Sequence, residues 1–393
     1  MDFKLTEKQI QFRDEVKAFL EAEKEAGVFP FSGNNAFIHG LSQGFSKKMA
    51  EKGWVGMTWP VEYGGKGLGY FDRVILMEEM LEVGAPIGFH FMGDRQVGPG
   101  LIHFGTDFLR KKFLSEIINA DISFCLLFSE PDAGSDLANC RTTAVDKGDH
   151  YIINGQKVWT SNGHLADYGW ALVKTNSDPN ISKYNSFSEI IIDMKDPCVT
   201  VRPLINLADT HSFNEVYFDN LKVSKDYLVG KQDNGFRQIM TNLDYERAGI
   251  ERLMQNYGVK EALIEYVKTT TRNGLPLSKD SLIRDAIARI EVEFQVAKLF
   301  VYYVACLLDE GKIPTFEAAM GKTVCTLYEA KLADVATSLM GLAGLLMPDS
   351  PEAFFDGIVC ESYLWSPSYT LQGGTIEVLK NIIARRGLKL GGK

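Results

Sequence analysis

The sequence predicts an α+β fold in which an N-terminal helical domain, a middle β-barrel domain and a C-terminal four-helix bundle follow one another. Apolar residues recur at helical spacing near the N-terminus, short strand-like runs separated by turn residues follow, and helical spacing returns after Gly235. Helices, then strands, then helices are typical of α+β chains rather than of alternating βαβ units. We therefore expect domains at residues 1–120, 121–232 and 233–393.

The N-terminal domain is expected to be helical because Thr6 and Gln9 form a capping box ahead of a helical apolar repeat. Further helical patterns cover residues 45–53, 72–83 and 106–118, with a glycine-rich break at 63–69.

The middle domain is expected to be a compact barrel or sandwich of short strands. Asn154-Gly155 lies between two apolar runs and predicts a hairpin turn at that point. Other strand-like runs cover residues 170–173, 189–194, 199–201 and 215–218. In the C-terminal domain the spacing predicts helices over residues 236–271, 279–310, 315–343 and 375–386.

The composition excludes several classes of protein. The chain has 393 residues, a net charge of -9 and 45% hydrophobic residues, which is typical of a soluble globular protein and unsuited to nucleic acid. Its six cysteines and six histidines lack the spacing of disulfide frames or metal sites, so we expect no metal. Neither a signal peptide nor a long apolar run is visible, so we expect a cytoplasmic location without membrane insertion.

A turn-rich segment at residues 128–136, reading FSEPDAGSD, follows a strand-like run. Such a segment can present backbone N–H groups and hydroxyls to an anion or to the edge of a polar ring, although an ordinary surface turn has the same composition. Beyond the expected hairpin, Trp159 and Ser161 offer an aromatic plane and a hydroxyl for a flat cofactor, although a lone tryptophan also suits a protein core.

Four segments together resemble the acyl-CoA dehydrogenase family. Residues 128–136 are similar to its T/S-E-P-x-A-G-S-D motif, and GQKVWTSNG at 155–163 is similar to its G-x-K-x-W-I-T-N-G motif. The run EVYFDNLKVSKDYLVG at 215–230 and the segment GTIE at 374–377 resemble two later motifs. Their order and spacing match from residue 5 to about residue 388. The resemblance implies the fold of this family, FAD as the cofactor, and dehydrogenation between the α and β carbons of an acyl-CoA thioester.

The resemblance also assigns cofactor-binding residues. It implies that the isoalloxazine ring of FAD lies against four residues of the middle domain, namely Phe128, Ser129, Trp159 and Ser161. Ser135 would contact a pyrophosphate of the cofactor or substrate, and Thr375 and Glu377 would reach FAD from the last helix.

The catalytic base requires a separate argument, because the usual glutamate before the Gly-Thr pair is Gly373 here. Ile239, Leu243, Ile250, Leu253 and Tyr257 form one apolar stripe, and Glu246 falls on it. Burial raises the pKa of a carboxyl toward the range of a general base. Isovaleryl-CoA and long-chain acyl-CoA dehydrogenases are similar in placing their base in an E-R pair on this helix. The alternative is that Glu246 forms a structural ion pair with Arg247 or Arg252.

Other residues are expected on the substrate side. By the resemblance, Asp244 and Arg247 flank the CoA or acyl entrance, and the backbone at Gly373 and Gly374 polarises the thioester carbonyl. Arg95 either binds a carboxylate on the substrate or, as we favour, pairs with a local acid such as Asp94 or Asp107.

Two family elements that hold FAD across a subunit interface are altered. The R-x-x-F-G element reads TTTRNG at residues 269–274, and the Q-x-x-G-G-x-G element reads SLMGLAG at 338–344. This pattern resembles bacterial members that act on bulky substrates such as steroid side chains, several of which are α2β2 assemblies. We expect a homotetramer or an α2β2 heterotetramer with a second chain of this type, and an electron-transfer flavoprotein as acceptor. A non-catalytic subunit that completes the FAD site, or an oxygen-reacting flavoenzyme, are the alternatives.

Overall fold

The computed structural model describes residues 3–28, 36–246 and 249–391, with the side chains of 36, 37 and 243–246 not described. The chain divides into two compact units, each built from segments that are discontinuous in sequence. The sheet unit comprises Phe37–Leu68 and Pro86–Glu246, and the helical unit comprises Met1–Ala36, Gly69–Ala85 and Arg247–Lys393. No helix in the described part of the chain is long and apolar enough to cross a membrane.

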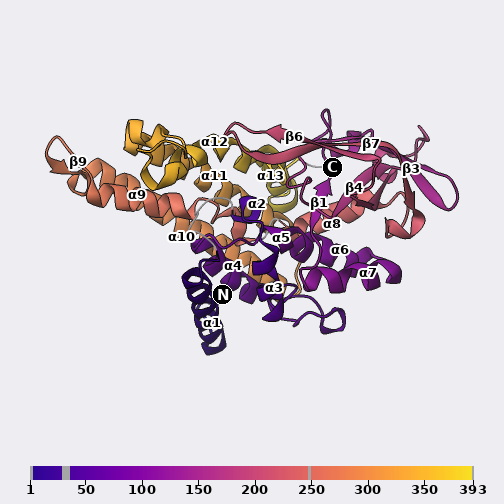
Figure 1. Ribbon diagram of the computed structural model, residues 1–393, viewed down its shortest axis with the longest axis horizontal. Helices are drawn as coiled ribbons and strands as arrows, with labels where there is room; N and C mark the ends of the chain where they lie inside the picture. Colours follow the sequence, from indigo (N-terminus) through magenta and orange to yellow (C-terminus); the bar gives the residue numbers. More distant parts are fainter. Residues whose placement is uncertain (1–2, 29–35, 247–248, 392–393) are drawn as a thin grey trace. The chain divides into compact units, whose positions relative to one another are not determined.

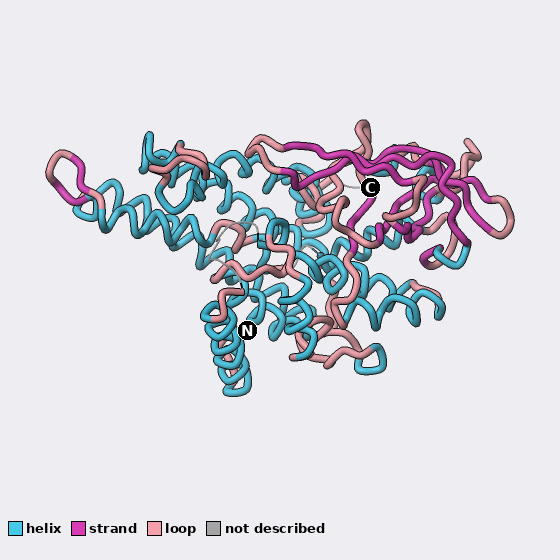
Figure 2. The backbone as a smooth tube through the Cα atoms, in the orientation of Figure 1, coloured by secondary structure: helices cyan, strands magenta, loops and turns pink. Residues whose placement is uncertain are grey.

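The sheet unit is built on one eight-stranded sheet, in which seven strands follow the order β6-β7-β3-β2-β4-β5-β8 and β1 pairs with β4 in parallel. The strands gather in one region of the ribbon and of the tube (Figures 1 and 2). Their bounds are β1 Phe124–Leu127, β2 Thr143–Asp146, β3 His150–Lys157, β4 Tyr168–Lys174, β5 Phe187–Asp193, β6 Val199–Ile205, β7 His211–Ser224 and β8 Leu228–Val229.

Strands β4 and β5 are buried on both faces, which explains their nearly continuous apolar sequences. On one face Ala171 and Ile190 belong to a core formed by the strands. On the other face Trp170 and Ile191 pack against helices, and so does Leu172. These helices include α6 Gly98–Phe104, α7 Asp107–Ile118 and α8 Gly235–Glu246. The sheet unit also contains α2 Ala36–His39, α3 Gln43–Glu51, α5 Gly88–Met92 and a π-helical turn at Gly93–Val97.

The helical unit joins helices from both ends of the chain. Its elements are α1 Glu7–Glu25, α4 Tyr70–Glu82, α9 Tyr257–Thr269, the β9–β10 hairpin (Thr271–Arg272 and Leu275–Pro276), α10 Ser281–Asp309, α11 Thr315–Met340, α12 Ile358–Leu371, α13 Ile376–Ile382 and a π-helical turn Ile383–Gly387. The expected capping box of Thr6 and Gln9 is confirmed at the start of α1. Glu78 on α4 forms ion pairs with Arg13 of α1 and Lys298 of α10. Its carboxylate also accepts a hydrogen bond from Tyr302 at 2.9 Å.

The expected hairpin at Asn154-Gly155 is wrong. Strand β3 runs through this dipeptide, and its pairing with β7 shifts between Ile153 and Gly155, which is a β-bulge. Gly155 has φ of +149°, and a Cβ there would lie 2.7 Å from the Cα of Thr142. The glycine is therefore required by close backbone approach rather than by a turn.

The continuous helix expected over residues 236–271 is also wrong. Helix α8 ends at Glu246, a short 3-10 helix follows at Ile250–Arg252, and α9 begins only at Tyr257. Gly249 before the 3-10 helix is extended, with φ of -83° and ψ of 145°, and an extended residue cannot continue an α-helix.

Helix α12 was not among the expected helices, and it contains Pro367, which removes one backbone donor. The proline has no N–H for the carbonyl of Tyr363, but the hydroxyl of Ser366 donates to that oxygen at 2.8 Å. A side chain thus replaces the missing backbone donor, and the helix continues to Leu371.

Candidate active site

The segment at residues 128–136 is fixed by a buried ion pair. Lys157 is fully buried at the end of β3, and its Nζ lies 2.9 Å from Glu130 Oε1 and donates to the carbonyl of Phe128 at 3.0 Å. The backbone N–H groups of Arg141 and Thr142 donate to the same carboxylate at 2.5 and 2.9 Å. Burial opposes ionisation of Glu130, but Lys157 and these hydrogen bonds hold its pKa below the usual range.

This anchoring brings the two family motifs of the sheet unit together. The N–H of Val158 donates to the carbonyl of Ser129 at 2.9 Å. The two segments that carry the residues expected to bind the cofactor are therefore neighbours in space at this point. Phe128 and Ser129 are half-buried on one side of this contact, and Trp159 and Ser161 follow on the other. Ser135 is exposed further along the first segment.

The turn at Trp159 fits a flat cofactor. Trp159 has φ of +59°, a conformation that is costly for a bulky residue, and its indole is 57% exposed. Phe213 packs against this ring, with centroids 5.7 Å apart and planes at 83°. Next to it the buried hydroxyl of Thr160 has no hydrogen-bond partner within the described chain. An exposed aromatic plane beside an unsatisfied hydroxyl fits an isoalloxazine ring and its polar edge.

Asn214 of β7, a residue missed by sequence reasoning, holds this turn in place. Its backbone carbonyl accepts from the N–H of Thr160 at 3.1 Å, and its side-chain amide donates to the carbonyl of Thr160 at 3.0 Å. The same amide is hydrogen-bonded to His211 and His164, whose rings stack with centroids 3.9 Å apart.

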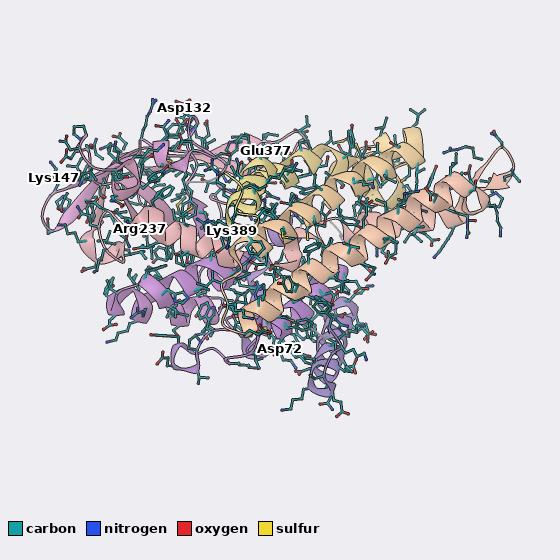
Figure 3. The ribbon with its side chains drawn as sticks, turned by 180° about the vertical axis from the view of Figure 1, so that it is seen from behind. Asp72, Asp132, Lys147, Arg237, Glu377 and Lys389 are labelled. Atoms are coloured by element: carbon teal, nitrogen blue, oxygen red, sulfur yellow. The ribbon has the colours of Figure 1, made fainter. Side chains whose placement is uncertain are left out.

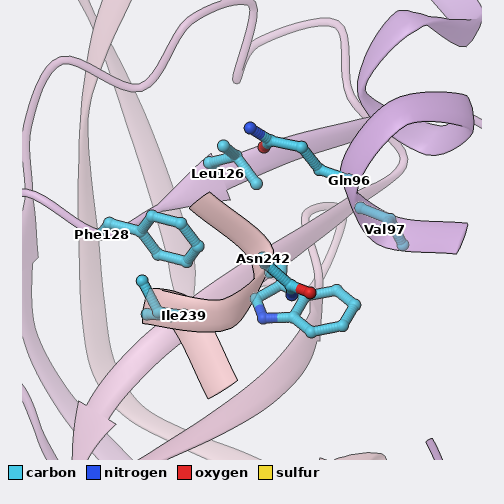
Figure 4. A pocket seen from close by; sticks show the side chains of 7 residues that line it. Gln96, Val97, Leu126, Phe128, Ile239 and Asn242 are labelled. Atoms are coloured by element: carbon cyan, nitrogen blue, oxygen red, sulfur yellow. The ribbon is translucent and has the colours of Figure 1, made fainter. Parts of the chain in front are cut away.

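A small pocket lies beside Phe128 in the same unit (Figure 4). Its other lining residues come from the π-helical turn, β1, β4 and α8, and are Gln96, Val97, Leu126, Trp170, Ile239 and Asn242. The lining is mainly apolar with two amide side chains, a composition typical of a site for an apolar ligand with a few polar atoms.

The expected base lies at the end of the helix that contributes to this pocket. Glu246 is the last residue of α8, one helical turn beyond Asn242. The expected apolar stripe, which ran along one helix from Ile239 past Glu246 to Ile250, is wrong. Helix α8 ends at Glu246, and Ile250 belongs to a separate 3-10 helix. The side chains of Asp244 and Glu246, and Arg247 altogether, lie outside the described residues.

The second set of expected site residues lies in the helical unit, after α12. Gly373 and Gly374 have φ of +65° and +100°, so both occupy backbone conformations that favour glycine. The carbonyl of Gly374 accepts from the buried Lys322 of α11 at 2.6 Å. Thr375 then caps α13 by accepting from the N–H of Val378 at 3.3 Å, and Glu377 is exposed in the first turn, as Figure 3 also shows.

A buried polar network supports this glycine turn. Glu329 of α11 is fully buried and accepts from the backbone N–H groups of Gln255 and Asn256 at 2.9 and 3.1 Å. Tyr369 donates to the side chain of Asn256 at 2.9 Å, and Gln372 donates to that of Gln255 at 3.3 Å. Burial raises the pKa of Glu329 well above its ordinary value. The network ties the end of α12 to α11, and none of its members was identified from the sequence.

Arg95 is buried in the π-helical turn, with its guanidinium 5.3 Å from the ring centroid of Phe91. Both acids proposed as its partners have other contacts. Asp94 accepts from the N–H of Gly56 at 2.7 Å, and Asp107 lies 3.3 Å from Arg110.

The altered family element after α9 forms the β9–β10 hairpin, with a turn at Asn273 and Gly274. Its Arg272 donates to the carbonyl of Leu339 in α11 at 3.0 Å. The displaced arginine therefore has a contact within its own chain.

Comparison with known proteins gives matches over almost the whole chain. Family models described as the N-terminal, middle and C-terminal domains of acyl-CoA dehydrogenase match residues 6–121, 125–221 and 233–388. Acyl-CoA dehydrogenase IpdE1 of Mycobacterium tuberculosis is 31% identical over 388 residues, which cover 97% of each chain.

Two solved structures cover the whole of this chain and of their own. One is the Tcur3481-Tcur3483 steroid ACAD, with a TM-score of 0.88 and 26% identity. The other is the ChsE4-ChsE5 complex from Mycobacterium tuberculosis, with a TM-score of 0.87 and 29% identity.

Proposed function

The chain belongs to the acyl-CoA dehydrogenase family, and from that premise we propose that it introduces a double bond between the α and β carbons of an acyl-CoA thioester with Glu246 as the base. The single observation that carries the proposal is the pocket between Phe128 and α8. Its lining includes Phe128, which the family resemblance assigns to the cofactor, and Ile239 and Asn242 of α8, the helix that ends at Glu246.

In the proposed reaction, each of the residues named below has a separate role. The carboxylate of Glu246 takes the α-proton, and the electron pair left behind forms the new double bond as a hydride departs from the β carbon. The backbone N–H of Gly373 stabilises the negative charge that develops on the thioester oxygen, a role that needs no side chain. The apolar lining of the pocket excludes water from the reacting carbons.

Family members are FAD-dependent, and the residues of the Trp159 turn fit this cofactor. FAD, when bound, supplies the hydride acceptor, and an electron-transfer flavoprotein then receives the electrons. In this proposal Phe128, Ser129, Trp159 and Ser161 hold the ring. Ser135 would contact a pyrophosphate, and Thr375 and Glu377 would reach FAD from α13.

Glu246→Gln tests the assignment of the base. The anaerobic bleaching of bound flavin by acyl-CoA should slow by about 10²–10⁴-fold, the range for loss of a general base. Flavin content and the melting temperature should stay unchanged. Glu265→Gln, which alters an exposed acid on α9, serves as the matched control. Unchanged bleaching in Glu246→Gln would contradict the proposal and would support a non-catalytic subunit that completes the FAD site of a partner.

We further propose that the acyl group is bulky and that the working enzyme contains a second, related chain. Two observations support this proposal. Among the similar structures are a steroid ACAD and a ChsE4-ChsE5 complex, and Arg272 of this chain contacts its own α11. Co-purification from the native host, followed by bleaching with linear, branched, aromatic, dicarboxylic and steroid acyl-CoAs, would test both parts. A homotetramer that reacts fastest with short linear substrates would refute them.

A further inference from the structure

Trp170 forms one wall of the pocket, and its indole is tightly enclosed. The side chain is 2% exposed and lies on β4, on the face of the sheet that packs against helices. A Cβ at Gly100 of α6 would lie 2.7 Å from the indole and 2.8 Å from the amide of Asn242. The glycine therefore leaves the space that the indole and the amide occupy.

The indole is held by an acid that the chemistry proposed above does not use. Glu189 of β5 is fully buried, and its Oε1 accepts from the indole N–H of Trp170 at 2.7 Å. Trp170 pairs with Ile191 and Leu172 pairs with Glu189, so the tryptophan and the glutamate are diagonal neighbours on one face of the sheet. Long side chains reach each other across such a diagonal.

The other oxygen of Glu189 reaches α8. Gln238 donates to Oε2 at 2.6 Å and also to the carbonyl of Val229 at 3.1 Å. Gly230 makes room for this amide, because a Cβ there would lie 2.3 Å from the Gln238 oxygen. Gln238 and Asn242 are one turn apart on α8, so Glu189 connects two walls of the pocket.

A purely structural contact would not require an acid at this position. Burial disfavours ionisation of Glu189 and raises its pKa to about 8, and a buried acid is often no more stabilising than an apolar side chain of similar volume. Its two oxygens, however, fix the rotation of the indole and the position of α8 at the same time, which an apolar side chain cannot do.

We propose that Trp170 is a specificity-determining wall of the acyl pocket and that Glu189 is the positioning residue that orients it together with α8. The inference rests on the proposed function, because it takes the pocket to be the acyl site. The indole then sets the width available to the acyl group. A change that frees or removes the indole should therefore raise the reaction rate with wide acyl groups relative to the rate with narrow ones.

The test uses the flavin-loaded protein, with any companion chain that co-purifies, and compares anaerobic bleaching by hexanoyl-CoA and by a steroid acyl-CoA. The variants are Trp170→Phe, Trp170→Ala, Glu189→Gln and the double variant Trp170→Phe/Glu189→Gln. Asp193→Asn, which alters an exposed acid on the same strand, is the control.

Trp170→Ala should raise the steroid-to-hexanoyl ratio of bleaching efficiencies by tenfold or more. Trp170→Phe and Glu189→Gln should each raise it by a smaller factor. The double variant should match the larger single effect, because both changes interrupt the same hydrogen-bonded chain from the indole to α8: Phe has no N–H, and Gln has one acceptor oxygen for two donors. Asp193→Asn should leave the ratio unchanged.

A ratio that stays within twofold of the wild-type value in Trp170→Ala and Glu189→Gln would overturn the inference and leave the proposed function intact. Multiplication of the two effects in the double variant would overturn the positioning role of Glu189. A wild-type protein that no acyl-CoA bleaches would overturn the proposed function and the pocket role with it. Thermal melting of each variant distinguishes loss of fold from altered selectivity, since a merely structural role would lower the efficiency for both substrates alike.

Discussion

The ion pair between Lys157 and Glu130 allows a quantitative prediction about the segment that carries the first cofactor motif. Replacing Lys157 by Met keeps an unbranched apolar side chain, one atom shorter than that of lysine, but removes its charge. Breaking a buried pair by removing one partner costs about 3–5 kcal/mol, because the other charge stays buried and unpaired. The N–H groups of Arg141 and Thr142 still donate to Glu130, so we expect a loss of about 3 kcal/mol, at the lower end of that range.

Equilibrium urea unfolding followed by circular dichroism measures this loss. Lys195→Met is the matched control, because Lys195 pairs with Asp167 at 2.6 Å but is 74% exposed, and exposed pairs contribute about 0–1 kcal/mol. The pKa of Glu130 is lowered in the folded protein, so the pair stabilises above the unfolded pKa and its contribution disappears as the pH falls through the folded pKa. The difference between wild type and Lys157→Met should therefore shrink in acid. Equal effects of the two lysine substitutions near pH 7 would refute the reasoning.

Two further predictions concern acids away from this pair. Because the pKa of Glu189 is raised from 4.5 to about 8, the folded protein keeps a proton that the unfolded chain releases, so stability should fall with rising pH across this window by ~1.4 kcal/mol per unit. Unfolding of wild type and Glu189→Gln at pH 5.5, 6.5 and 7.5 checks this, and equal slopes would contradict it. Asp309 of α10 accepts from the N–H groups of Tyr70 and Phe71 at 2.5 and 3.1 Å, so Asp309→Ala should cost about 1–2 kcal/mol, as loss of a helix cap does. Asp309→Asn should recover part of that loss, and a melting temperature equal to wild type in Asp309→Ala would exclude the capping role.

The helices could be predicted where a local pattern specifies them. The capping box at Thr6 and Gln9 and the apolar repeats of α7 and α10 depend only on residues close in sequence. The same local reasoning was wrong at Asn154-Gly155, because it could not show that β2 and β7 pair with both sides of β3 there. A strand that is paired along both edges continues through a dipeptide that would form a turn in isolation.

The end of α8 shows a second limit of local reasoning. Apolar spacing continues from Ile239 to Leu253, although the helix ends at Glu246, because residues of a 3-10 helix are buried as well as those of an α-helix. The apolar spacing correctly indicated buried residues, but it did not indicate that one helix runs through all of them. The choice of Glu246 consequently rests on the family resemblance and on its place at the end of α8 rather than on periodicity.

The supporting network of the candidate site had no local signal. Glu329 meets Gln255 and Asn256 across 73 or 74 residues, and Glu189 meets Gln238 across 49. The sequence alone does not distinguish a buried glutamate in a strand or helix from an exposed one, because burial depends on residues far away in the chain. Motifs can therefore identify residues that touch a cofactor, whereas the residues that orient them emerge only from the fold.

The contacts of Glu78 have a consequence for folding during synthesis. Its partner Tyr302 is 224 residues further along, and Asp309, which caps the same helix, is later still. During synthesis the first helices leave the ribosome long before these partners exist, so Glu78 has Arg13 but lacks Lys298 and Tyr302, and the N–H groups of Tyr70 and Phe71 lack their acceptor. Helix α4 therefore gains these contacts only after the last third of the chain has been made. A prematurely terminated product would lack stabilising contacts near its N-terminus as well as its C-terminal residues.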